Sequence, residues 1–124
     1  MVSRWTSRKS SGRRLKRAIS IRQPYAEQIL LGVKTEEYRS VPTKIRERVY
    51  IYASLGPGDS VDFRKMKAEP GDFPTGVLVG TVEIVNCKWD SRRGCFAYGL
   101  ERPRRLVRPL RSPKRPQPVW WRPF

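Results

Sequence analysis

Apolar and polar residues alternate along several short stretches of this chain, a pattern typical of β-strands with one buried face. The clearest example is the segment 48–54, where Val49, Ile51 and Ala53 alternate with tyrosines and a serine. The longest predicted strand spans 76–89, and Gly80 within it indicates a bend or bulge. Strands are expected over five segments: 15–21, 34–39, 48–54, 76–89 and 119–121.

Two short helices are predicted between these strands. Pro24 stands where a first helical residue would be, apolar residues follow it at helical spacing up to Val33, and Gly32 indicates the end of the helix. A second helix is expected over 60–67, before the break at Pro70. Beyond Trp89 the chain is basic and proline-rich, so it is predicted to be irregular until 119.

These elements predict one small domain of the α+β class. Four or five strands around one or two short helices are typical of a small, partly open β-barrel. The 124 residues leave no room for a second domain, and eleven prolines with nine glycines argue against a helix bundle.

The positive charge is concentrated at the two ends of the chain. The net charge is +16; residues 1–17 carry seven basic residues and no acid, and residues 18–91 are neutral. Residues 92–124 carry ten basic residues and the single acid Glu101. We therefore expect a disordered basic arm over 1–16 and a folded domain over 17–124 that includes a basic, proline-rich C-terminal segment. Trp5 in the arm is either a nucleic-acid contact or incidental composition.

Such charge segregation favours a polyanion as the partner, with binding that weakens steeply as salt rises. A merely soluble basic surface is the alternative. An anionic membrane fits poorly, because the basic ends have no apolar stripe at helical spacing, and no run of about 18 apolar residues could span a bilayer.

The absence of histidine excludes Ser-His-Asp and Cys-His catalysis and makes a zinc site improbable. Cys87 and Cys95 match no metal-ligand spacing, so we expect free thiols, with Cys87 filling a core position. No metal or cofactor is expected, a cytoplasmic location fits this composition, and the oligomeric state stays open.

Two ordered motifs carry a family resemblance. AISIRQPYA over 18–26 and GVKTEEYR over 32–39 resemble the opening of an ASCH domain, and 51–54, 74–82 and 116–121 are similar to later parts of it. The ASCH family belongs to the PUA-like folds, so the resemblance implies a small β-barrel that binds RNA or a modified nucleotide.

The resemblance also raises the question of catalysis. One similar branch hydrolyses the amide of an acetylated cytidine nucleoside with a lysine, a threonine and a glutamate, and another member is assigned ribonuclease activity. Lys34 matches that lysine, but Glu37 occupies the place of the threonine, so the hydroxyl nucleophile is missing. As an enzyme, Glu37 would act as general base while Lys34 or an arginine stabilised an oxyanion.

A binding cleft is the favoured interpretation of these residues. Arg22 and Arg39 would hold a phosphate or a base edge by forked hydrogen bonds, and Glu37 would accept from an amine or a ribose hydroxyl. Alternatively, Glu37 and Arg39 form an ion-pair network that supports the barrel. The candidate nucleic-acid-binding residues are Arg22, Gln23, Tyr25, Lys34, Glu37, Tyr38, Arg39 and Ser54.

Two further features have open interpretations. Tyr25, Tyr38, Trp120 and Trp121 are either stacking platforms for bases or core residues. The segment 102–115 is either a charged loop or a strap that clamps a nucleic-acid backbone beside the cleft. The sequence thus favours an RNA-binding module, and the alternative is a metal-independent hydrolase of RNA or of a modified nucleoside.

Overall fold

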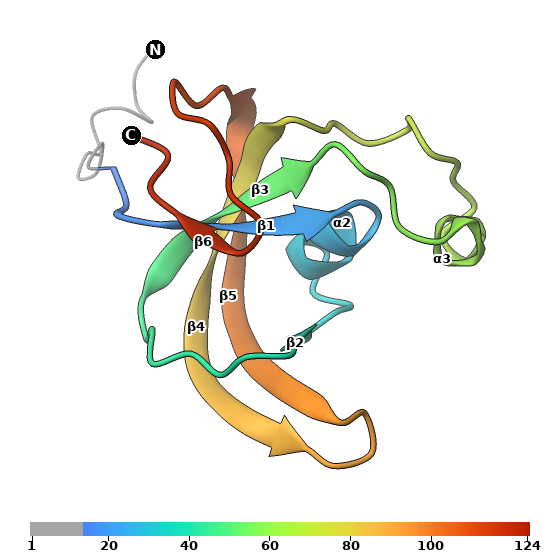
Figure 1. The fold of residues 1–124 in the computed structure, drawn as a ribbon. Helices are drawn as coiled ribbons and strands as arrows, with labels where there is room; N and C mark the ends of the chain where they lie inside the picture. The colour runs from blue at the N-terminus through green and yellow to red at the C-terminus, as the bar shows by residue number, and fades with distance from the viewer. Residues whose placement is uncertain (1–13) are drawn as a thin grey trace.

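The computed structural model describes residues 14–124, so most of the arm expected over 1–16, with Trp5, lies outside the described residues. The described part contains six strands in one sheet and two short helices, and the expected α+β class is confirmed (Figure 1). The elements in chain order are β1 (Ala18–Arg22), α2 (Tyr25–Leu30), β2 (Glu36–Arg39), β3 (Arg48–Ser54), α3 (Ser60–Lys65), β4 (Val77–Asp90), β5 (Cys95–Leu110) and β6 (Trp120–Trp121).

The sheet is curved into a half-barrel with the strand order β2-β5-β4-β3-β1-β6. Only the β1–β3 pair is parallel, and the long β4–β5 hairpin bends around the interior (Figure 1). The main core fills that interior, with Ile19, Ile51 and Val82 fully buried and Ile29 of α2 packed among them. The alternation along 48–54 therefore predicted the buried face of β3 correctly.

The bulge expected at Gly80 is confirmed. The register between β4 and both of its neighbours shifts near this residue, and its α-carbon lies against the side chain of Leu30 and the carbonyl of Arg104. A β-carbon at this position would overlap both groups, so only glycine lets α2 and β5 approach β4 here.

A second apolar cluster lies on the outer face of the sheet. Tyr50, Tyr52 and Trp121 belong to it, and Leu106 and Leu110 of β5 pack against it. Leu15 and Phe124 also pack there, and the Arg14 guanidinium lies 4.1 Å from the centre of the Phe124 ring. The beginning and the end of the described chain therefore meet on this face.

The prediction of irregular chain beyond Trp89 was wrong, because β5 occupies Cys95–Leu110. A tight turn returns the chain: the Asp90 carboxylate accepts from the backbone N–H groups of Arg92 and Arg93, and Gly94 has a φ of 68°. Pro103 and Pro109 stand where the pairing with β4 is interrupted by register shifts, so neither removes a ladder hydrogen bond. The other predicted elements exist, with ends shifted by up to three residues.

Candidate functional site

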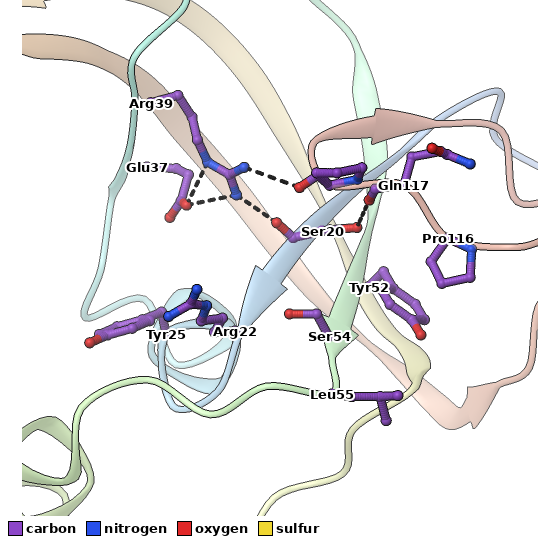
Figure 2. A pocket seen from close by; sticks show the side chains of 11 residues that line it. Ser20, Arg22, Tyr25, Glu37, Arg39, Tyr52, Ser54, Leu55, Pro116 and Gln117 are labelled. Atoms are coloured by element: carbon purple, nitrogen blue, oxygen red, sulfur yellow. Dashed lines mark hydrogen bonds and ion pairs between the residues drawn. The ribbon is translucent and has the colours of Figure 1, made fainter.

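A cleft of about 620 Å³ lies where the two edges of the half-barrel approach each other (Figure 2). It is lined by residues from β1, β2, β3 and α2, by Leu55 after β3, and by a short segment before β6, which we call the strap (residues 116–118). The lining residues are Ser20, Arg22, Tyr25, Glu37, Arg39, Tyr52, Ser54, Leu55, Pro116, Gln117 and Pro118.

The floor of the cleft consists of alternate residues of β1 and β3, whose side chains point to the same face of the sheet. Ser20 and Arg22 of β1 are register partners of Tyr52 and Ser54 of β3. Partners across a parallel pair share one face of the sheet, and here it is the face opposite the main core. Sequence reasoning missed Ser20 and Tyr52, although the same alternation that places Ile19 and Ile51 inside would have placed them here.

Glu37 and Arg39 form an ion pair at the wall of the cleft. Arg39 Nε lies 3.0 Å and Nη2 lies 2.9 Å from Glu37 Oε2. Nη2 also donates to the Ser20 carbonyl at 2.5 Å, and Nη1 contacts the Pro118 carbonyl at 3.5 Å (Figure 2). Arg39 of one sheet edge thus braces β1 and the strap at the other edge, so most of its donors are already used.

Lys34 contacts Glu37 but is not among the residues that line the cleft. Its Nζ is 3.7 Å from Glu37 Oε1 and 4.8 Å from the centre of the Tyr38 ring. Both carboxylate oxygens of Glu37 therefore face a cation. Tyr38 is also outside the cleft: Arg93 lies 4.2 Å from its ring centre, and its hydroxyl donates to Glu36. Burial, followed by this hydrogen bond, raises the pKa of Tyr38.

Arg22 differs from Arg39 in its neighbours. It is exposed at the C-terminal end of β1, and it makes no hydrogen bond or ion pair with another residue of the described part of the chain. Its guanidinium lies over the cleft between Tyr25 and Ser54 (Figure 2). Arg22 is consequently the cleft cation whose full set of donors can meet a ligand.

Gln23 and Tyr25 support the rim of the cleft. Gln23 is 2% exposed, donates through Nε2 to the Pro74 carbonyl and accepts from the Glu27 N–H, so it holds the turn rather than lining the cleft. The Tyr25 hydroxyl donates to Asp62, and that hydrogen bond is the main cause that raises the pKa of Tyr25. The Tyr25 ring lies against Gly58, where a β-carbon would overlap it.

The strap is tied to β1 through Ser20. The Ser20 Oγ donates to the Gln117 carbonyl at 2.6 Å and accepts from Trp121 Nε1 at 3.0 Å. The Ser20 N–H donates to the Val119 carbonyl. The proline-rich segment predicted over 102–115 therefore begins as strand β5, and the residues beside the cleft come after it.

Three further observations concern metal-binding groups, cysteines and membrane-spanning helices. No cluster of three or more Cys, Asp or Glu side chains suited to a metal ion occurs among residues 14–124. Cys87 and Cys95 are free thiols, and Cys87 packs against the main core as predicted. No helix in the same residues is long and apolar enough to cross a membrane.

Comparison with known protein families identifies this half-barrel with its cleft as an ASCH domain, which residues 19–101 match. The chain belongs to this family. The resemblance carried by the motifs at 18–26 and 32–39 is thereby confirmed. Activating signal cointegrator 1 of Homo sapiens is 29% identical to this chain over 80 residues, and the Mus musculus protein is equally similar. The similarity covers 56% of this chain but only 14% of each cointegrator. The strap lies outside the matched residues.

Proposed function

We propose that this chain is an RNA-binding module that takes an unstacked nucleotide of single-stranded RNA into the cleft. The observation that carries the proposal is Arg22, an exposed guanidinium at the cleft with no partner among the described residues. A forked guanidinium matches the geometry of a phosphate and can bind it through two parallel hydrogen bonds.

The remaining groups of the cleft suit the rest of a nucleotide. The Ser54 hydroxyl lies on the same floor as Arg22 and can bond a ribose hydroxyl or a base edge. Tyr25, Tyr52 and Leu55 supply apolar surface beside these polar groups. A volume of about 620 Å³ is in the ordinary range for a small-ligand pocket, which supports one nucleotide rather than a duplex.

The surroundings of the cleft favour a polyanion over a free nucleotide. Six exposed basic residues from β5 onward form no ion pair with another described residue: Arg104, Arg108, Arg111, Lys114, Arg115 and Arg122. Lys114 and Arg115 directly precede the strap, so a phosphate next to a nucleotide bound in the cleft would meet positive charge on that side.

The contacts of the Glu37 carboxylate favour binding over hydrolysis as the function of the cleft. A general base needs a free oxygen to take a proton from water, but Oε1 faces Lys34 and Oε2 accepts from Arg39. The hydroxyl that the family's amidohydrolase branch uses is also absent, since Glu37 stands in its place. We therefore propose that Glu37 positions Arg39 and does not act as a general base.

Fluorescence anisotropy with a labelled single-stranded oligoribonucleotide tests this function. We expect Arg22→Ala to weaken binding by about ten-fold or more, and Arg22→Lys to recover only part of it because the fork is lost. Arg64→Ala is the matched control: it removes one exposed arginine from α3, outside the cleft, and should cost no more than one surface charge. Equal effects of Arg22→Ala and Arg64→Ala would remove the cleft from the proposal.

A further inference from the structure

Trp89 near the end of β4 is an exposed aromatic residue with a fixed orientation. Its side chain is 58% exposed, although tryptophan is usually well buried. The ring meets Phe96 edge to face, with 5.1 Å between ring centres and 71° between the planes, and Phe96 itself packs against the main core. The indole is thus held from one side and open on the other.

This residue lies in the same row of the sheet as the wall of the cleft. Arg39 of β2 is the register partner of Phe96 of β5, which is in turn the partner of Trp89 of β4. Partners across antiparallel strands share a face, and neighbouring strands are about 4.8 Å apart, so the backbone of Trp89 is roughly 10 Å from that of Arg39. The open indole therefore lies on the same face of the sheet as Arg39, which lines the cleft.

The charge around Trp89 favours an anionic partner. Arg92, in the turn after β4, is exposed and forms no ion pair with another residue of the described chain, whereas Arg93 is neutralised by Asp90 at 2.9 Å. An apolar ring close to a free arginine offers a base an aromatic face and offers its phosphate a positive charge, a combination typical of single-strand binding surfaces. An apolar protein partner would leave this cation desolvated without a counter-charge.

We propose that Trp89 is a stacking platform for a nucleobase next to the one held in the cleft, an inference that rests on the proposed RNA binding. Because every base has an aromatic face, this contact should add affinity without sequence preference. It should also add affinity only to a strand long enough to reach from the cleft to Trp89.

The test compares two single-stranded oligomers of about eight positions, a length typical for small single-strand binding domains. One is an ordinary oligoribonucleotide and the other has the same backbone with abasic sites. In anisotropy titrations, Trp89→Ala should weaken binding of the first about ten-fold and leave binding of the second unchanged. Trp89→Phe should keep most of the affinity. Val107→Ala is the control, since it removes another exposed apolar side chain from β5 and should change neither titration.

Each remaining outcome counts against the platform in a distinguishable way. If the parent chain binds the oligoribonucleotide and Trp89→Ala binds it equally well, the platform is wrong while RNA binding stands. If Trp89→Ala loses the same factor on both oligomers, the residue acts through the fold, and a parallel urea melt will show that loss. If the parent chain binds neither oligomer, the proposed function fails and the platform fails with it.

Discussion

Arg22 and Arg39 line the same cleft but are held differently, and substitution should separate them. Arg39→Ala removes the donor to Oε2 of the buried Glu37 carboxylate and to the Ser20 carbonyl, so we expect a loss of about 2 kcal/mol in the free energy of unfolding. Arg22→Ala removes an exposed side chain without a described partner and should change stability by less than about 0.5 kcal/mol.

Urea unfolding followed by tryptophan fluorescence measures both values. An Arg39→Ala variant as stable as the parent, with its RNA binding lost, would make Arg39 a ligand-contacting residue rather than a brace between the two edges of the sheet.

Glu37 offers a test of catalysis at the same scale. We expect no hydrolysis of acetylated cytidine and no cleavage of unstructured RNA by the parent chain, because both oxygens of Glu37 face cations. Chromatography of the two incubations, each beside the Glu37→Gln variant, checks this. Turnover by the parent that falls roughly 10²–10⁴-fold in Glu37→Gln would instead identify a general base and overturn the binding-only proposal.

The candidate residues show which part of a site can be predicted from a sequence. Arg22, Glu37 and Arg39 lie in motifs that resemble a family, and the structure brings them to one cleft. Ser20 and Tyr52 were within reach, since simple alternation sets them beside Arg22. The position of the strap beside the cleft could not be predicted, because it depends on hydrogen bonds between Ser20 and residues about 97 positions later in the chain.

The packing of α2 and β5 on β4 depends on Gly80, which has no side chain. Gly80→Ala would drive a β-carbon into the Leu30 side chain and the Arg104 carbonyl, so we expect a loss of about 1–3 kcal/mol and a lower midpoint in urea. Gly56→Ala is the control, because nothing lies within 4 Å of its β-carbon position. Equal midpoints for the two variants would show that the bulge can open without cost.

Strand β5 was not predicted from the sequence, because its prolines suggested irregular chain. Local rules for proline predict an interrupted chain over 103–118, and Pro103 and Pro109 do interrupt the ladder. The strand nevertheless persists across these breaks, because pairing with β4 resumes after each of them and Leu106 and Leu110 pack on the outer apolar cluster. Tertiary pairing of this kind overrides local propensity and leaves no short-range signal.

At the scale of the molecule, the contacts of Leu15 predict where the folded domain begins. Residues 1–13 hold no apolar pattern that could build a core, whereas Leu15 packs against the outer cluster. A chain lacking 1–13 should therefore keep the urea midpoint of the parent and lose RNA affinity with its four basic residues. A chain lacking 1–16 should also unfold earlier. Full stability of the shorter chain, or a large loss in the longer one, would contradict this boundary.

The central claim is that the cleft and its basic surroundings bind the backbone of single-stranded RNA, and the salt dependence of binding tests it most directly. Each phosphate contact on a single strand contributes about −0.7 to the slope of log Kobs against log salt concentration. With Arg22 and several of the free basic residues of the C-terminal segment engaged, we expect a slope of about −3 or steeper in anisotropy titrations of the full chain. A slope near zero, or no binding even at low salt, would contradict the account.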